Sequence, residues 1–333
     1  MNLKWKHMRT CKVFNPILLF LLFVSCSKSD STFIDAIQIE TGKSHRLNDL
    51  LIVDSMMYTC GGTRADVGFI LSAEISSDGD FQEVFSLSDY SIYSLGVSPN
   101  GTLWSGGEFL KIHTSSNGVQ WSALELGAQV PFHEQDRPAI RKFEIISDQE
   151  ILFVGGENLN EGIIYHSSNS GVSWTFRFDQ HEFRDLCSLD GSSFFVAGHG
   201  ILSGFDSSLD YINAPEVNYE FFKGIENNEA GTLVAITQSG QIKSSFDSGQ
   251  TWETYQSSSN QSLSSISLND IEYSNGIYVI CGNSGRIFFS SDGTNWSSYQ
   301  LWDAPNLYSA AIYNSKCYFT SDNGKIFVTE IQL

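Results

Sequence analysis

Residues 290–296 read SSDGTNW, and close variants of this phrase return along the whole chain. Six copies place a serine or other small residue, an acid or amide, a turn residue and an aromatic residue in the same order. The acids or amides are Asp78, Asn117, Asn169, Asp206, Asp247 and Asp292, at intervals of 39, 52, 37, 41 and 45 residues. Such a period is typical of one four-stranded blade of a β-propeller.

The segments around each copy read as short strands that end at turns. One complete unit consists of LNDIEYSNG, IYVICGNSG, RIFFSSDG and TNWSSYQL, residues 268–301, so the motif falls between the third and fourth strands. At that turn the glycine takes a positive φ, and the acid or amide accepts hydrogen bonds from backbone N–H groups. The aromatic residue then starts the fourth strand and buries its ring. The tryptophans expected in this role are Trp121, Trp174, Trp252 and Trp296.

The motif resembles the Asp-box, or BNR, repeat of sialidase-type and related propellers. The longer phrase GNSGRIFFSSDGTNW, residues 282–296, is similar to the repeats of the photosystem II assembly and stability factor family. This resemblance implies a propeller fold, whereas it implies little about activity, because one fold carries many functions. The fourth copy departs from the pattern, since it lacks the glycine and has Tyr211 in place of tryptophan.

The fold class expected from these units is an all-β, seven-bladed β-propeller over residues 33–333. Six blades follow from the six motif copies, and residues 307–333 supply three strands of another. We expect residues 33–40 to complete that last blade, because a ring left open would expose unpaired backbone groups. Eight blades are the alternative if the 52-residue interval contains a further unit.

The N-terminus predicts a lipoprotein signal at residues 1–25 and a tether at residues 26–32. Four basic residues precede the apolar run ILLFLLFVS, which is too short to span a bilayer comfortably. Residues 23–26, FVSC, resemble a bacterial lipobox, so Cys26 is the expected site of lipidation and the membrane contact is a lipid anchor only. Ser27 at the next position favours the outer membrane, on its periplasmic or its outer side; ordinary cleavage is the alternative.

Charge and cysteine content narrow the function classes. Removal of residues 1–25 takes away four of the 19 basic residues and none of the 38 acidic ones. The formal net charge of the remaining chain is therefore 15 − 38 = −23. So acidic a surface repels phosphate, and no nucleic acid partner is expected. Four further cysteines, Cys60, Cys187, Cys281 and Cys317, lack metal-like spacing and are expected to be buried and unpaired, with disulfides as the alternative. No metal and no cofactor is expected.

The loops opposite the Asp-box turns are the expected binding face, because propeller loops vary there without disturbing the sheets. The candidates on this face are Arg64, Glu108, His133, Arg137, Glu157, His199 and Trp302. The sialidase arginine cluster is absent, and no fixed spacing marks a pair of catalytic carboxylates. We therefore expect no catalytic residues and a non-enzymatic, outer-membrane-anchored module that binds a protein within an envelope complex. A cell-surface protein that binds or hydrolyses glycans is the alternative.

Overall fold

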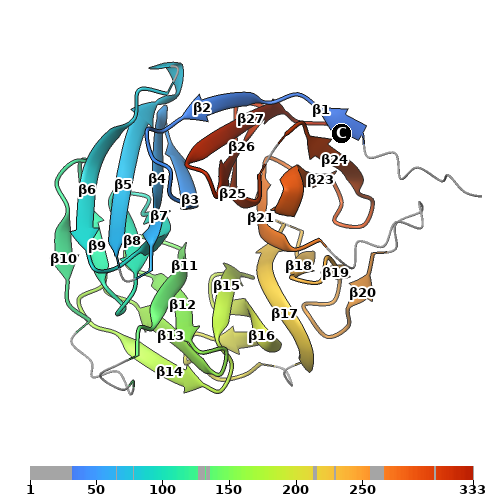
Figure 1. Ribbon diagram of the computed structural model, residues 1–333. Coiled ribbons are helices and arrows are strands. Elements are labelled where there is room, and N and C mark those ends of the chain that lie inside the picture. The colour runs from blue at the N-terminus through green and yellow to red at the C-terminus, as the bar shows by residue number, and fades with distance from the viewer. Residues whose placement is uncertain are drawn as a thin grey trace, which may run out of the picture. The chain divides into compact units, whose positions relative to one another are not determined.

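Six β-sheets stand in a ring around a central channel in the computed structural model (Figure 1). The structure describes residues 32–64, 66–77, 79–126, 132, 136–212, 216–228, 230–255, 266–303 and 305–332. Residues 31–333 form one compact unit, and the description applies to that unit. Most of its strands have two to eight residues, as the sequence pattern predicts, and two strands of one sheet are longer.

The first three sheets each contain four antiparallel strands in sequence order. The first consists of β3 (Leu47–Val53), β4 (Met56–Thr63), β5 (Val67–Glu74) and β6 (Gln82–Ser88), with a 3₁₀ turn, η1 (Ile75–Ser77), after β5. The second consists of β7 (Ile92–Val97), β8 (Leu103–Gly107), β9 (Ile112–Ser115) and β10 (Ser122–Leu124). The third consists of β11 (Ala139–Ile145), β12 (Ile151–Glu157), β13 (Glu161–Ser167) and β14 (Thr175–Asp179).

The remaining three sheets complete the ring. The fourth contains β15 (Phe183–Ser188), β16 (Ser193–Asp206), β17 (Glu216–Asn227), β18 (Leu233–Thr237), β19 (Ile242–Ser245) and β20 (Glu253–Thr254). The fifth contains β21 (Leu268–Ser274), β22 (Ile277–Gly282), β23 (Arg286–Ser290), β24 (Ser297–Leu301) and β1 (Thr32–Ile34), with η2 (Asn283–Gly285) after β22. The sixth contains β25 (Leu307–Tyr313), β26 (Lys316–Ser321), β27 (Lys325–Glu330) and β2 (Ile37–Glu40).

The prediction of seven blades is wrong, because the strands form six sheets. The two repeat units that contain Asp206 and Asp247 share the fourth sheet, which has six strands. Its middle strands β16 and β17 are 14 and 12 residues long, and they pair with each other from His199–Phe221 to Leu202–Glu216. Motif spacing counts repeat units, whereas backbone pairing decides which units form a separate sheet. The alternative of eight blades fails for the same reason.

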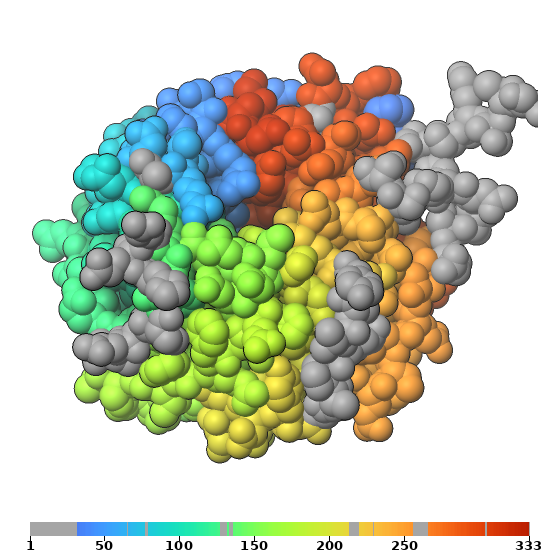
Figure 2. Space-filling view, turned by 60° about the horizontal axis from the view of Figure 1, so that its bottom comes forward, coloured from blue at the N-terminus to red at the C-terminus, as the bar shows by residue number. Residues whose placement is uncertain are grey.

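The N-terminal strands close the ring. β2 pairs antiparallel with β27 as the outer strand of the sixth sheet, which confirms that a segment before the first unit completes the last one. β1 lies parallel to β24 at the edge of the fifth sheet, which the sequence did not indicate. Figure 2 shows the early part of the chain packed against its C-terminal strands. The hydroxyl of Thr41 donates to the carbonyl of Gly324 at 2.5 Å and links the two chain ends further.

Apolar side chains between neighbouring sheets form the core. Tyr278 and Phe288 of the fifth sheet, for example, pack with Val234 and Ile236 of β18, and Trp296 covers this cluster. Burying a large apolar side chain contributes about 1.5–3 kcal/mol, so each seam between sheets is a substantial source of stability. The cysteines at 60, 187, 281 and 317 are buried and free, as predicted.

Candidate functional site

The Asp-box turns use their polar groups within each turn. The hydroxyl of Ser290 accepts from the Gly293 N–H at 2.9 Å, and Asp292 Oδ1 accepts from the N–H groups of Thr294 and Asn295 at 2.8 Å each. Partial burial raises the pKa of the Asp292 carboxyl, but these bonds outweigh it and hold that pKa well below its usual range. Equivalent carboxylate or amide oxygens accept backbone N–H groups at Asn117, Asn169, Asp206 and Asp247.

The turns are also distributed around the ring rather than gathered at one place. Four of the six copies have a tryptophan, and each of these packs into an apolar cluster; Trp121, Trp174 and Trp252 are partly buried and Trp296 is buried. In the fourth copy, which lacks the glycine, Leu209 adopts φ +66° three residues after Asp206, whereas the glycine of the other copies lies one or two residues after the acid or amide. Asp78 of the first copy lies outside the described residues.

Four of the loop-face candidates meet in one ion-pair network. Arg64 Nη2 pairs with Glu157, and Arg64 Nε lies 3.4 Å from Glu108 Oε1. Arg137 Nη2 lies 3.2 Å from Glu108 Oε2, while the backbone N–H of Arg137 donates to Glu157. Glu108 Oε2 also accepts from the Ser91 N–H at 3.0 Å. Both carboxylates are buried, and both their oxygens have cationic or N–H neighbours.

The other loop-face candidates lie apart from this network. His199 Nδ1 lies 3.0 Å from the Leu159 carbonyl, and its imidazole meets Phe221 edge to face at 5.3 Å. Trp302 stacks on Phe33 near the edge strand β1. His133 and the lipidation candidate Cys26 lie outside the described residues.

The central channel is lined by the first strand of each repeat unit. These strands, β3, β7, β11, β15, β17, β21 and β25, contact one another in that order and close a ring. Each of them shifts its pairing register at the same level, as a β-bulge does; in β11 the shift falls between Ile140 and Lys142. A bulge breaks the in–out alternation of a strand and re-aims side chains. Two consecutive residues, Arg141 and Lys142, therefore both line the channel.

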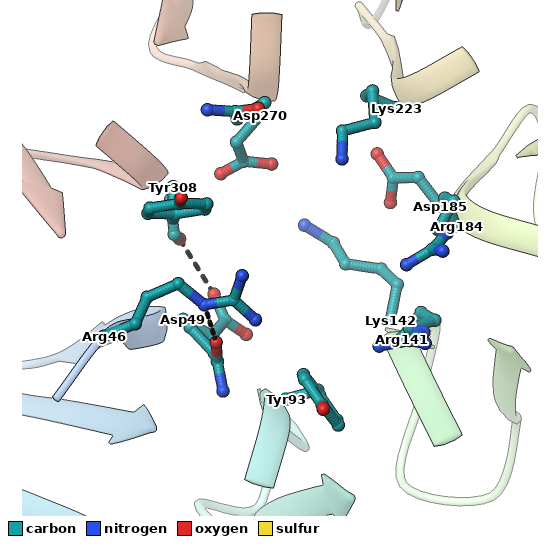
Figure 3. A pocket seen from close by; sticks show the side chains of 13 residues that line it. Arg46, Asp49, Tyr93, Arg141, Lys142, Arg184, Asp185, Lys223, Asp270 and Tyr308 are labelled. Carbon is teal, nitrogen blue, oxygen red and sulfur yellow. Dashed lines mark hydrogen bonds between the residues drawn. The ribbon is translucent and has the colours of Figure 1, made fainter. Parts of the chain in front are cut away.

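The bulges bring cations and tyrosines to one end of the channel, here called the mouth. Figure 3 shows these side chains converging from several strands on a cavity of about 140 Å³. Arg46 lies over the Tyr308 ring at 4.7 Å, and Arg141 lies over Tyr93 at 4.6 Å. Such cation–π contacts hold a guanidinium in place while its N–H groups stay available. The mouth residues are Arg46, Tyr93, Arg141, Arg184, Lys223 and Tyr308.

Cations outnumber their carboxylate partners at the mouth. Glu182, which is buried, pairs with Arg141 and Arg184 at 3.0 Å each. Within the described part of the chain, no ion pair joins Arg46 or Lys223 to a carboxylate. Burial, together with the positive charges of Arg184, Arg46 and Arg141, lowers the pKa of Lys223 to about 8. Mutual repulsion among the cations is thus part of the folded state, and an anion at the mouth would relieve it.

Three aspartates that line the same cavity as the mouth residues join neighbouring strands. Asp49, Asp185 and Asp270 accept from the N–H groups of Leu95, Ile225 and Ala310 on the next channel strand, at 2.8 Å each. Burial raises the pKa of Asp185 to about 7 and that of Asp270 to about 6. These three carboxylates, here called the acid layer, brace the channel.

Lys142 lies between the mouth and the deeper channel. Burial disfavours its charge, but Asp185, Asp270 and Asp49 outweigh that effect and hold the pKa of Lys142 well above its usual range. A second cavity of about 310 Å³ beyond the acid layer is lined by Glu144, Glu226 and Glu272, among others. The channel is therefore polarised, with cations at the mouth and carboxylates at the far end.

The mouth and the ion-pair network belong to one continuous surface. A cavity of about 230 Å³ contains Arg64, Glu108 and Glu157 together with Tyr93, Arg141 and Arg184 of the mouth. Sequence reasoning selected the outer part of this surface and missed the channel strands. A signal was present: Arg141-Lys142, Arg184-Asp185 and Lys223-Gly224 occupy the same point of three consecutive units.

The described residues contain neither a metal-binding cluster nor a membrane-spanning helix. No group of three or more histidine, cysteine, aspartate or glutamate side chains there is arranged to hold a metal ion. No helix in the same residues has the length and apolar character needed to cross a bilayer.

Comparison with known proteins identifies the family. The family model for photosynthesis system II assembly factor YCF48 matches residues 80–329. The chain belongs to the YCF48 family. Members share a propeller of BNR repeats, which is the fold described above. No curated protein sequence matches the chain.

Solved propellers are similar to this chain in fold. The structure of YCF48 bound to a D1 peptide has a TM-score of 0.70 and 17% identity, over 91% of this chain and 99% of the other. The WD40 propeller of Doa1 gives a TM-score of 0.67 at 13% identity, over 90% and 96% of the two chains. A computationally designed protein, Ika8, gives 0.58 at 12% identity, over 88% and 99%. At these identities the likeness shows the fold alone.

Proposed function

We propose that this protein is a non-enzymatic assembly module that captures an acidic segment of a partner protein at the mouth of its channel. The observation that carries the proposal is the convergence of Arg46, Arg141, Arg184 and Lys223 on one cavity. Glu182 pairs with two of these cations, and the aspartates that also line the cavity, Asp49, Asp185 and Asp270, accept backbone N–H groups of neighbouring strands. Arginine N–H groups bind carboxylates in a fixed fork geometry, and Tyr93 and Tyr308 add hydroxyl groups and ring faces.

The charge of the whole chain makes this cavity selective. A chain of formal charge −19 repels acidic partners over most of its surface, so the mouth offers a local attraction where cations gather. A bound carboxylate would replace the repulsion that depresses the pKa of Lys223 with an attractive pair. The structure of YCF48 with a D1 peptide gives a precedent for a peptide ligand within the family.

The second part of the proposal is the location. A lipid on Cys26, as the lipobox-like FVSC indicates, would tether the propeller to the outer membrane, where it would serve an envelope complex. Mass spectrometry of the mature protein tests this directly. The expected result is an N-terminal diacylglyceryl-cysteine, and an unmodified N-terminus after a different cleavage would refute the anchor.

The carboxylates of the ion-pair network, Glu108 and Glu157, do not favour a hydrolase. Glu108 and Glu157 are each held by arginine and backbone N–H groups, whereas a glycosidase needs one carboxyl group that can donate a proton. A glycan ligand at the same surface stays an alternative outcome of a glycan array.

Binding is tested with a fluorescein-labelled octaglutamate peptide followed by anisotropy. The expected result is binding at about 50 mM salt that weakens strongly at about 300 mM, because exposed charges are screened. An uncharged glycine–serine peptide of the same length is the control and should not bind, whereas a polycation would bind the acidic surface elsewhere. Equal binding of both peptides, or binding of neither, would contradict the proposal.

A further inference from the structure

An exposed aromatic ring near the start of the described chain stacks on another that lies late in the sequence. Phe33 in β1 and Trp302 after β24 stack with their centroids 4.2 Å apart and an interplanar angle of 21°. Trp302 is 58% exposed and Phe33 is 44% exposed, although each is a large apolar side chain. The backbone N–H of Trp302 donates to the backbone carbonyl of Ile34 at 3.3 Å, and this contact holds the pair in place.

Phe33 borders a groove with an apolar and a polar wall; the polar wall consists of Asp35, Lys316, Thr329, Glu330 and Gln332. This groove has a volume of about 480 Å³, and its apolar wall includes Phe33, Ile34, Ala36, Ile37 and Val328. Ile37 is 64% exposed. Phe33, Ile37 and Trp302 together, here called the aromatic edge, therefore present apolar surface at the outer side of the fifth and sixth sheets, away from the channel strands (Figure 1).

The position of this edge in the chain indicates what covers it. Cys26 precedes Thr32 by six residues, and a chain of that length spans at most about 20 Å. A lipid on Cys26 would therefore keep the aromatic edge within about 20 Å of the bilayer surface. Tethering at that distance raises the effective concentration of the edge at the membrane, so a weak contact becomes populated.

The chemistry of the edge suits a lipid interface. Tryptophan and phenylalanine place large rings at the boundary between headgroups and acyl chains. The chain as a whole is acidic and gains no electrostatic attraction to anionic lipid, so contact has to come from apolar side chains such as these. β1 has only three residues, which makes this edge a poor template for strand addition by another protein.

We propose that the aromatic edge formed by Phe33, Ile37 and Trp302 inserts into the bilayer interface beside the lipid anchor and fixes the orientation of the propeller on the membrane. This inference rests on the lipid anchor of the proposed function. With the edge against the bilayer, the mouth, which is built by other strands, stays open to a partner. The propeller is then an oriented receptor rather than a tumbling one.

The test uses the acylated full-length mature protein in phosphatidylethanolamine and phosphatidylglycerol vesicles that carry brominated acyl chains. Bromine quenches tryptophan fluorescence at short range, and the difference between wild type and Trp302→Phe isolates the emission of Trp302. We expect brominated lipid to remove roughly half or more of that emission, because interfacial rings lie at the acyl boundary. In the Phe33→Ser background the same difference measurement should recover most of the Trp302 emission, because the edge no longer holds Trp302 at the acyl boundary.

The control places a tryptophan at another exposed aromatic position. Phe246, 52% exposed, lies in an Asp-box turn of the fourth sheet, and Phe246→Trp in the Trp302→Phe background should be quenched far less.

Equal quenching at both positions, or none at Trp302 in protein whose acylation is verified by mass, would overturn the contact while leaving the anchor intact. Absence of acyl mass at Cys26 would instead refute the anchor and the contact with it. Quenching at Trp302 accompanied by dimers in the vesicles would assign the edge to a second copy and also overturn the proposal.

Discussion

The Asp-box turns and the mouth of the channel are both built by repetition, but they use their charges in opposite ways. The acid or amide of a turn accepts backbone N–H groups no more than four residues away in the chain, as Asp292 does from Thr294 and Asn295. The mouth assembles Arg46, Arg141 and Lys223 from strands far apart in sequence and leaves positive charge in excess. The regular motif therefore stabilises the fold, and in the function proposed above the positions between motif copies carry recognition.

The largest expected effect is on a turn. Gly249 has φ +78°, and a Cβ there would lie 2.2 Å from the ring of the buried Phe195. Gly249→Ala should lower the free energy of unfolding by about 2–4 kcal/mol through overpacking and backbone strain, as urea unfolding would measure. Gly276→Ala is the matched control, with φ +82° and open space around the new Cβ; it should cost only about 1 kcal/mol. Equal losses would show that the turn does not pack as described.

The next effect separates binding from stability. The double variant Arg46→Gln/Lys223→Gln removes two cations without leaving a carboxylate unpaired, because neither has an ion-pair partner in the described part of the chain. Octaglutamate affinity should fall at least tenfold, about 1.4 kcal/mol, with the free energy of unfolding changed by less than about 0.5 kcal/mol. Lys43→Gln, which breaks the exterior pair with Glu83, is the control and should leave affinity unchanged. A loss of affinity of twofold or less in the double variant would exclude the mouth as the binding site for octaglutamate.

A smaller effect tests the turn acid as a hydrogen-bond acceptor. Asn117 and Asn169 occupy the position of Asp292 in two other copies and accept the same kind of bond. Asp292→Asn should therefore cost less than about 1 kcal/mol at pH 7. The pKa of Asp292 is lower in the folded state than in the unfolded state, so its carboxylate contributes stability at neutral pH that is lost as the pH falls. The free energy of unfolding of the Asp292→Asn variant should therefore decrease less than that of the wild type when the pH is lowered. Loss of peptide binding in this variant would contradict a purely structural role.

The smallest effect is a pH dependence of binding. Lys223 has a pKa of about 8 and loses its charge as pH rises from 7 to 9, while the ligand carboxylates stay ionised. Octaglutamate affinity should then fall about two- to threefold over this range as one of several cations is neutralised. Lys223→Gln should bind more weakly at pH 7 and show a smaller fall in affinity between pH 7 and 9; some fall remains because Asp185, whose pKa is raised to about 7, lines the same cavity and gains negative charge over this range. A wild-type profile that does not change between pH 7 and 9 would exclude Lys223 from the contact.

The sequence predicted the propeller and the positions of its turns because both depend on local chemistry. The residue types of Asp247, Gly249 and Trp252 recur in the same order in most copies, with the glycine one or two residues after the acid or amide, so one copy explains the others. The number of sheets could not be read in the same way, since the union of two units depends on how far β16 and β17 pair. Closure by β2 was predictable because the last unit lacked a strand.

The candidate site was predicted only in its outer part. Glu108 and Glu157 stood out as acids in loops, and they meet at the edge of the mouth. Arg141 and Arg184 lie within strands, where alternation alone assigns one residue of each Arg-Lys or Arg-Asp pair away from the channel. The bulge that brings both residues of a pair to the channel depends on pairing with the next strand, which a single strand sequence does not encode.

The comparison between mouth and turn is tested most directly by photocrosslinking in native membranes. A benzophenone side chain replaces Tyr308 at the mouth in one variant and Phe246 in an Asp-box turn in the other. The account predicts that the probe at 308 crosslinks to one acidic segment of a single protein, in competition with octaglutamate, and that the probe at 246 does not. Adducts at 246 that match or exceed those at 308, or adducts at 308 that octaglutamate leaves unchanged, would contradict it.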